Sequence, residues 1–383
     1  MLHHLYYIHQ AWKFNMSNCK REITIFMPNL FSGGAERMTL NLVAGFIDRG
    51  INVTLLLATP VVKLKKYIHP NVNVVHLNCK RTLYSIPKLA WYIKKHKPKN
   101  LLSHINRANR VALIAALLIR SDTRVHVVEH NTVSVRISNY SIIPKLLILF
   151  FYKFVYRSAA NIIHVSKTAA DDLQKMVFKN KINVKYIYNP IVDEKMFNDI
   201  NEKPPHPWLK NKNIPVILGV GSLRSQKDFL NLINAFSILK QNKQARLIIL
   251  GEGEERNIIE KSIIKYKLQD CVDIPGYVDN PLQYMRYASV FVLSSRTEAL
   301  PTALVEAMAC GCPVVSTDCP SGPAEILDNG KYGPLVPIKN PSALSDAIMK
   351  SLANPIPKKV LRARAMEFSK VQSVDKYIKM LGI

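Results

Sequence analysis

Short apolar runs alternate with longer stretches that carry hydrophobic residues on one face. In the first half, continuous apolar runs predict parallel strands covered by helices on both faces. These strands are Ile23–Met27, Val53–Ala58, Val72–His76, Asn100–His104, Val125–Val128 and Asn161–Val165. Between them the 3.6-residue pattern predicts helices at Ala35–Arg49 and Ile142–Arg157, and the apolar run Val111–Ile119 predicts a buried helix.

A second series of the same kind follows a polar, proline-containing stretch. Its predicted strands are Val216–Val220, Arg246–Leu250, Val272–Ile274, Val290–Leu293 and Pro313–Ser316, and its predicted helices are Lys227–Gln241, Glu254–Tyr266, Thr302–Ala309 and Ser342–Ala353. We therefore predict an α/β protein with two Rossmann-like, doubly wound domains, 20–192 and 213–358, joined by a linker at 193–212. A ligand is expected in a central cleft, at the carboxyl ends of the strands.

The charge is distributed unevenly along the chain. Its 383 residues contain 53 Lys and Arg against 27 Asp and Glu, and residues 1–190 hold 28 of the former and seven of the latter. The first half should therefore face an anionic partner. No aromatic-basic motif or recognition helix stands out, so we expect no nucleic-acid partner.

One predicted helix joins this positive charge to an apolar surface. In Ile142–Arg157 the cations Lys145, Lys153 and Arg157 fall at about 0°, 80° and 120° around the helix axis. This single arc is typical of a helix lying on an anionic membrane leaflet. The alternative is a helix buried against the sheet with one wet edge.

The cysteines and the apolar segments bear on the compartment. The six cysteines include no C-x-x-C pair, which favours reduced thiols, and Cys310, Cys312 and Cys319 lack a second ligand cluster, so we expect no metal site. No run reaches the roughly 18 apolar residues of a spanning helix. Met1–Trp12 lacks the features of a signal peptide.

Two glycine pairs lie after predicted strands. Gly219-x-Gly221 and Gly251-x-Gly253 have arginine where a dinucleotide-binding fingerprint has its third glycine, which argues against a nicotinamide cofactor. In the loop after Gly221, Arg224 and Lys227 are three residues apart at the start of a helix. They could hold one anion there, or they could simply be solvated.

The densest candidate segment runs from Ser294 to Val315, with Glu298 before a predicted helix, Pro301 in its first turn and Glu306 inside it. A carboxylate accepts two hydroxyl donors and so suits a sugar or ribose diol. In the first half, Gly33-Gly34 opens a helix after a strand, as a phosphate loop or a tight turn. His130 follows a strand at its carboxyl end and is either structural or functional.

These motifs together resemble glycosyltransferase family 4. The resemblance rests on Gly33-Gly34-Ala35-Glu36-Arg37, on the Arg224…Lys227 loop, on Gly251-Glu-Gly253 and above all on Glu298-Ala-Leu-Pro-(x)4-Glu306-Ala-Met-Ala-x-Gly311-x-Pro313-Val, and it covers about Ile23–Ala353. Members are retaining, nucleotide-sugar-dependent enzymes of the GT-B fold. The resemblance also implies that a final segment, 359–383, forms a helix that crosses back to the first domain.

The family's site residues carry over to matching positions. Catalytic roles are implied for Glu298, His130 and Lys227. Donor binding is implied for these positions: Gly33, Gly34, Arg224, Lys227, Tyr277, Val278, Ala299, Leu300, Pro301, Thr302 and Glu306. Ser222 stands where the family usually has arginine, and Arg224 is the candidate replacement. Ala299 stands where the family often has glycine.

The resemblance implies a retaining transfer of a hexosyl or N-acetylhexosaminyl group from a nucleotide-sugar to a lipid-linked or glycan acceptor in cell-surface polysaccharide synthesis, including lipopolysaccharide. We expect the nucleotide-sugar to be UDP-linked. No metal and no further cofactor is expected, since no Asp-x-Asp motif is present. The expected place is the cytoplasm, peripheral at the inner membrane. Alternatives are a nucleotide-sugar epimerase or phosphorylase on the same fold, and a non-catalytic glycan-binding subunit.

Overall fold

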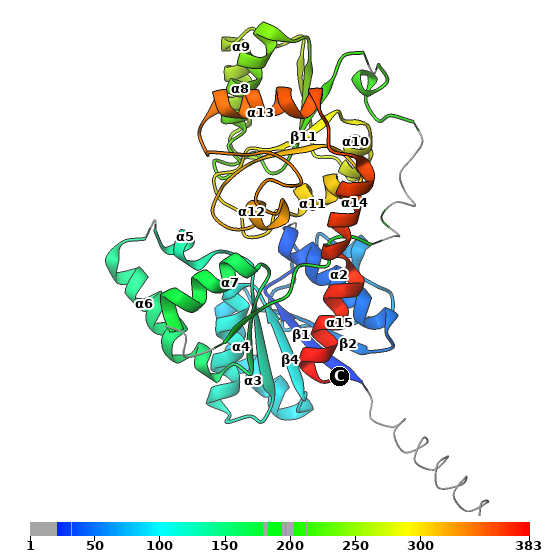
Figure 1. Cartoon of the computed structure of the whole chain (residues 1–383). Coiled ribbons are helices and arrows are strands. Elements are labelled where there is room, and N and C mark those ends of the chain that lie inside the picture. The colour runs from blue at the N-terminus through cyan, green and yellow to red at the C-terminus, as the bar shows by residue number, and fades with distance from the viewer. Residues whose placement is uncertain are drawn as a thin grey trace, which may run out of the picture. The chain divides into compact units, whose positions relative to one another are not determined.

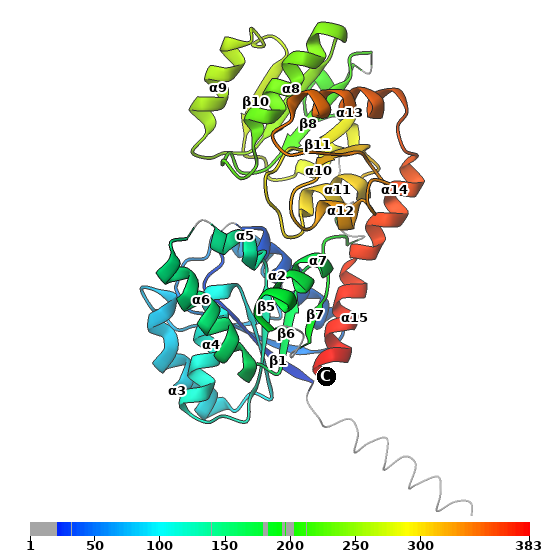
Figure 2. The ribbon, with the colours of Figure 1, turned by 60° about the vertical axis from the view of Figure 1, so that its left-hand side comes forward.

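The computed structural model describes residues 21–31, 33–138, 140–178, 183–193, 196, 203–211 and 213–383. Met1–Trp12 and part of the predicted linker 193–212 lie outside these residues. Within them the chain forms two parallel β-sheets with helices along them, shown from two directions in Figures 1 and 2. The α/β prediction is confirmed.

In the described residues the first sheet has seven strands in the order β3-β2-β1-β4-β5-β6-β7. The strands are β1 Glu22–Met27, β2 Asn52–Leu57, β3 Asn73–His76, β4 Asn100–His104, β5 Arg124–Glu129, β6 Asn161–His164 and β7 Val184–Tyr186. Neighbouring pairs such as β1–β2 and β1–β4 run parallel. The strand order reverses between β1 and β4, and ligands of doubly wound sheets bind at such a switch point.

Helices connect these strands. They are α2 Gly34–Asp48, α3 Ile86–His96, α4 Asn106–Leu118, α5 Val133–Ser138, α6 Ile142–Phe154 and α7 Lys167–Leu173, with a π-helical turn at Gln174–Phe178 and 3-10 turns at Lys65–Tyr67, Thr82–Ser85 and Tyr156–Ser158. With helices along the sheet, the interiors of β1, β2 and β4 are almost fully buried, as their continuous apolar runs predict.

The helix predicted at Ile142–Arg157 differs from the observed one. It ends at Phe154, and Arg157 lies in the following 3-10 turn, so the predicted arc keeps only Lys145 and Lys153. The buried alternative is also wrong. Tyr152 is buried, but α6 exposes a set of large apolar side chains: Ile142, Ile143, Leu146, Leu147, Phe150 and Phe154.

The second sheet has six strands in the described residues, in the order β10-β9-β8-β11-β12-β13. They are β8 Val216–Val220, β9 Arg246–Leu250, β10 Val272–Gly276, β11 Val290–Leu293, β12 Val314–Thr317 and β13 Leu335–Val336. The helices are α8 Phe229–Asn242, α9 Arg256–Lys265, α10 Pro281–Tyr287, α11 Thr302–Ala309, α12 Pro323–Ile326, α13 Pro341–Ala353, α14 Lys358–Ala365 and α15 Lys370–Leu381, with 3-10 turns at Pro207–Leu209 and Met366–Phe368.

Contacts divide the chain into two compact units. One comprises the residues up to Val128 with Phe154–Ile162 and Val374–Ile383, and the other comprises Glu129–Lys153 and Ile163–Ser373. In the first unit, Tyr377 of α15 packs edge-on against Phe46, and Asp375 pairs with Arg49 at 2.7 Å. The domain boundaries named above remain a prediction.

The helices of the described residues bear on how the chain meets a membrane. None of them is both long enough and apolar enough to cross a bilayer.

Candidate active site

The candidate site of the second sheet lies where the strand order reverses. β8 and β11 are neighbours, although the five elements from α8 to α10 separate them along the chain, and they run parallel. The loops that leave their carboxyl ends are therefore adjacent, which is where doubly wound sheets bind ligands. The first loop carries Arg224 and Lys227, and the second carries Glu298.

The structure brings Lys227 and Glu298 together. Lys227 Nζ donates to Glu298 Oε1 at 2.5 Å, and Ser295 Oγ donates to the same oxygen at 2.7 Å. The two side chains are only 22% and 10% exposed. A cation and a carboxylate from loops 71 residues apart thus form one charged cluster at the switch point.

A second ion pair holds the two loops in place. Arg296 donates from Nε and Nη2 to the two carboxylate oxygens of Asp228, both at 2.8 Å, and Asp228 is almost fully buried. This bidentate contact raises the pKa of Arg296 above its ordinary value. Gln226 Nε2 also donates to the Thr297 carbonyl at 2.7 Å.

Sequence reasoning missed Asp228, Arg296 and Ser295 as parts of the site. It also began the following helix at Lys227, but α8 begins at Phe229 because Asp228 takes a left-handed conformation, with φ of 49°. An aspartate tolerates that conformation better than most residues. Lys227 therefore lies in the loop, with its side chain directed to Glu298.

The glycine pairs have a packing role. A Cβ on Gly251, which has φ of +145°, would lie 1.9 Å from the Gly221 carbonyl oxygen, and one on Gly253 would lie 2.3 Å from that of Leu223. Gly221 N donates to Leu250 O at 3.0 Å. The loop after β9 approaches the loop after β8 so closely that only glycine fits at Gly251 and Gly253, which accounts for this pair without a dinucleotide.

Arg224 and Ser222 lie in the same turn as Lys227. Lys227 N donates to Arg224 O at 2.8 Å, and the Arg224 and Ser222 side chains are exposed. That turn presents Arg224 to solvent near the start of α8. Whether Arg224 replaces the family arginine at Ser222 stays a prediction.

The segment Ala299–Thr302 forms the entrance to α11. Pro301 is the N-cap of that helix and Thr302 its first residue, while Leu300 and Pro301 are buried. A Cβ on Gly322, which has φ of +65°, would lie 2.8 Å from the Ala299 carbonyl oxygen. A side chain at position 322 would therefore displace the backbone at Ala299, so Gly322 helps to position this segment, and no sequence motif had indicated it. One helical turn beyond Thr302, Glu306 is 7% exposed inside α11.

Tyr277 and Val278 follow β10. Gly276 ends that strand with φ of +90°, and its carbonyl accepts from Gly251 N at 2.8 Å. This links the loop after β10 to the glycine contact described above. Tyr277 is 68% exposed, so its ring is available for stacking.

Gly33 and Gly34 begin α2 after β1, at the switch point of the first sheet. Gly33 is the N-cap, and a Cβ there would meet the Glu36 carboxylate, which folds over the loop. Burial raises the pKa of Glu36. A Cβ on Gly34 would meet no atom within 4 Å, so space is open beside its backbone.

His130 follows β5 directly. Burial, and then the neighbouring His164, lower the pKa of His130 to about 3. The ring is therefore neutral near pH 7, and it can offer a hydrogen bond but not a charge. The imidazole of His164 shares a hydrogen bond of 3.2 Å with the Asn131 carbonyl, which orders the segment that carries His130.

Cys310, Cys312 and Cys319 are buried thiols. Burial raises the pKa of Cys310 and of Cys319 to about 12, and raises that of Cys312 as well. Protonated thiols are poor metal ligands. In the part of the chain that the structure describes, no group of three or more His, Cys, Asp or Glu is arranged to hold a metal ion.

Comparison with known proteins identifies the class. The family model "Glycosyltransferase Family 4" matches residues 32–195, and "Glycosyl transferases group 1" matches residues 201–368. Among solved structures, that of Anabaena Alr3699/HepE in complex with UDP has a TM-score of 0.74 at 18% identity, over 94% of this chain and 99% of that one. A glycosyltransferase from Rickettsia africae gives 0.76 at 19% identity, over 94% and 98%. The fold is therefore GT-B.

Two relatives of similar sequence are also glycosyltransferases by name. The chain is 28% identical to the Campylobacter jejuni N-acetylgalactosamine-N,N'-diacetylbacillosaminyl-diphospho-undecaprenol 4-alpha-N-acetylgalactosaminyltransferase, over 94% of this chain and 99% of that one. It is 31% identical to an uncharacterized glycosyltransferase of Methanocaldococcus jannaschii, over 65% of this chain and about three fifths (61%) of that one. The chain belongs to the family-4 type of glycosyltransferases and is an enzyme of that class.

Proposed function

We propose that this enzyme transfers a hexosyl or N-acetylhexosaminyl group, with retention, from a UDP-sugar to a lipid-linked or glycan acceptor in the synthesis of a cell-surface polysaccharide. The observation that carries the proposal is the Lys227–Glu298 pair at the switch point of the second sheet. The bound UDP of the Anabaena neighbour and the diphospho-undecaprenol substrate in the name of the Campylobacter relative support the choice of donor and acceptor class.

We assign each site residue a role in binding the donor or stabilising the transfer. Glu306, buried in α11, accepts hydrogen bonds from the ribose hydroxyls, and Tyr277 and Val278 meet the base. Lys227 and Arg224, with the amides at the start of α11, stabilise the diphosphate as it gains negative charge. Glu298 faces the transferred sugar beside the amides of Ala299 and Leu300, and neutral His130 contacts that sugar.

In this proposal the transfer requires neither a metal nor a protein base. The bond between the anomeric carbon and the diphosphate oxygen breaks, and the acceptor oxygen bonds to the same face of that carbon. The leaving phosphate oxygen takes the acceptor proton. Cations that hold the diphosphate therefore stabilise both the departing charge and the proton acceptor.

A donor screen tests this proposal. The full-length enzyme is incubated with the UDP-, GDP- and ADP-forms of common hexoses and N-acetylhexosamines, with and without a polyprenyl-diphosphate saccharide, and release of nucleoside diphosphate is measured. We expect acceptor-dependent release from a UDP-sugar, and loss of that release in Lys227→Ala. Epimerisation of the donor without release would favour the epimerase alternative, and binding without turnover would favour the non-catalytic one.

We also propose that α6 places the enzyme on the cytoplasmic face of the inner membrane. Ile142, Ile143, Leu146, Leu147 and Phe150 expose 58–75% of their surfaces to solvent. At about 100° per residue they share one side of the helix. Exposed apolar patches of this kind mark interaction sites, and a helix with cationic residues beside its apolar side favours an anionic leaflet.

Vesicle sedimentation tests the membrane placement. The full chain should pellet with anionic vesicles at low salt and be released at high salt, because the screening length falls to about 3 Å at 1 M. Lys145→Glu with Lys153→Glu should reduce pelleting, since each cation near the surface contributes about 1 kcal/mol. The matched control reverses Lys261 and Lys265 on α9. Equal pelleting of both double variants would refute the role of α6.

A further inference from the structure

A pocket lies at the amino ends of the central strands of the first sheet, away from their carboxyl ends. It has a volume of about 650 Å³, within the range of about 300–1,000 Å³ that small-molecule sites occupy. Its lining includes Glu22, Asn52 and Asn100, the first residues of β1, β2 and β4. We call it the amino-end pocket. The lining also includes His76, Leu77 and Asn78 at the carboxyl end of β3, but none of the residues assigned to the donor site above.

The sheet surface under this pocket is polar where a covered parallel sheet should be apolar. Thr24 on β1 pairs in register with Thr54 on β2, and Thr54 pairs with Asn73 on β3. Two residues further along the same face, Phe26 and Leu56 are both fully buried. The face thus changes from apolar to hydroxyl and amide at the pocket.

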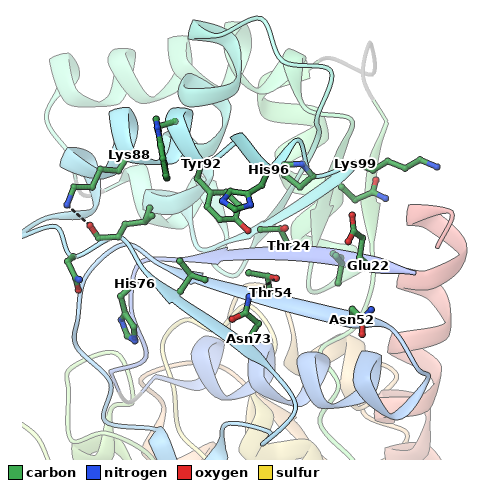
Figure 3. A pocket seen from close by; sticks show the side chains of 17 residues that line it. Glu22, Thr24, Asn52, Thr54, Asn73, His76, Lys88, Tyr92, His96 and Lys99 are labelled. Atoms are coloured by element: carbon green, nitrogen blue, oxygen red, sulfur yellow. Dashed lines mark hydrogen bonds between the residues drawn. The ribbon is translucent and has the colours of Figure 1, made fainter. Parts of the chain in front are cut away.

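Helix α3 supplies aromatic rings to the other wall. Figure 3 shows Tyr92 and His96 extending from α3 toward Thr24 and Thr54. The Tyr92 hydroxyl is hydrogen-bonded to both threonine side chains, and the His96 ring stacks on Tyr92 with centroids 4.4 Å apart. Beside them, Trp91 lines the pocket and is 60% exposed. Lys95 Nζ lies over the Trp91 ring, 4.7 Å from its centroid, so this cation covers one face of the indole and stacking is left to the other face.

The charged groups that line the pocket are Lys88, Lys99 and Glu22. Lys88 donates its ammonium to the Leu77 carbonyl at 2.7 Å, so this cation is engaged by the backbone. Glu22 adds a carboxylate to the lining, which would repel a phosphate. What remains is a set of neutral hydroxyl and amide groups facing aromatic rings. This combination matches a sugar, whose C–H faces stack on rings and whose hydroxyls both donate and accept.

From these observations we propose that the amino-end pocket is a second carbohydrate site, which binds a short neutral saccharide by stacking it on Trp91 and hydrogen-bonding it to Thr54 and Asn73. Asn73 Nδ2 donates to Thr54 Oγ1 at 3.4 Å, and both groups keep further hydrogen-bonding capacity. The site is separate from donor binding. Its occupancy therefore does not depend on the catalytic roles proposed above, and its failure would leave them unaffected.

Glycan binding in the presence of saturating UDP tests the proposal. The full chain is applied to an array of neutral oligosaccharides, and the saccharides that it retains are examined by saturation-transfer NMR and tryptophan fluorescence. We expect saturation transfer to the sugar ring protons. We expect Trp91→Ala to weaken the affinity about tenfold, which corresponds to about 1.4 kcal/mol. Thr54→Val, which keeps the shape and removes the hydroxyl, should weaken it by a smaller factor.

The control is Tyr266→Ala, which removes an exposed aromatic residue at the end of α9. It should bind saccharides as the wild type does. Trp91→Ala should also keep the wild-type rate of nucleoside diphosphate release with a short acceptor. No retained neutral saccharide, equal binding by Trp91→Ala and wild type, or displacement of the saccharide by inorganic phosphate would overturn the proposal.

Discussion

Replacing Glu298 by glutamine should strengthen the binding of UDP while it lowers transfer. In the structure, Lys227 Nζ donates to Glu298 Oε1 at 2.5 Å. A diphosphate must compete with this carboxylate for the lysine and also approach its negative charge. Glutamine keeps the size of the side chain and can still accept from Ser295, but it removes both the competition and the repulsion.

The magnitude follows from the burial of the pair. Exposed ion pairs contribute about 0.2–1 kcal/mol, and breaking a buried one costs about 3–5 kcal/mol. With 22% and 10% of the two side chains exposed, this pair lies between those limits. We expect about 1–2 kcal/mol of the interaction energy of this pair to appear as tighter UDP binding in Glu298→Gln, which lowers the Kd about five- to thirtyfold.

Isothermal titration calorimetry with UDP measures this effect directly. Glu260→Gln is the matched control, because it also removes one negative charge from the same sheet unit, at a glutamate that pairs with Arg256 on α9. Its Kd should equal that of the wild type. Lys227→Ala should shift the Kd the other way. A folded Glu298→Gln protein with unchanged or weaker UDP affinity would refute the competition between Glu298 and the phosphates.

Three further predictions concern other residues of the site. Glu306→Ala should weaken UDP binding about tenfold to a hundredfold by calorimetry, since charge-assisted hydrogen bonds are worth about 1.5–3 kcal/mol, and an unchanged Kd would remove Glu306 from the ribose. Asp228→Asn keeps the left-handed residue but breaks the charged contact with Arg296, so urea unfolding should show a loss of about 1–2 kcal/mol, and no loss would mean that the pair does not hold the loops. His130 has a pKa of about 3 when folded and about 6.5 when unfolded; the unfolded state therefore binds more protons between these values, and stability should fall as pH drops below about 6.5. His130→Asn should flatten that dependence, and an equal slope in both proteins would count against the buried neutral ring.

Much of the fold was predictable because parallel strands buried on both faces leave continuous apolar runs. β8, β9, β11 and β4 were predicted at their observed bounds. The missed α10 shows the limit of that approach. Its signal is an Asn280 cap followed by Pro281, and the whole helix has only seven residues, too few for a clear helical period.

The end of α6 was not predictable from periodicity. The apolar and cationic residues continue past Phe154 with helical spacing, yet the chain turns into a 3-10 segment there. The exposure of the apolar side chains of α6 was not predictable either, because the sequence of an apolar stripe is the same whether the stripe faces a sheet or solvent. Leu146 and Leu147, at 59% and 64% exposed, show that the stripe is not covered by the described chain.

The site was predictable in part. The segment around Glu298 and Glu306 was found through its similarity to a family, and Lys227 through its place in a strand-to-helix loop. Their pairing was not predicted, since nothing local relates residues 71 positions apart. The Asp228–Arg296 contact and the support from Gly322 depend on the same approach of distant loops. Such contacts follow from the strand order, which periodicity alone does not give.

The anomeric configuration of the product shows whether the enzyme transfers the sugar with retention. The enzyme is given the UDP-sugar that the donor screen selects and a polyprenyl-diphosphate saccharide, and the new linkage is read by NMR from its anomeric proton coupling. Retaining transfer from an α-linked donor predicts an α-linked product, formed by the wild type and greatly reduced in Glu306→Ala. A β-linked product would contradict same-face transfer, and equal product from both proteins would contradict the site itself.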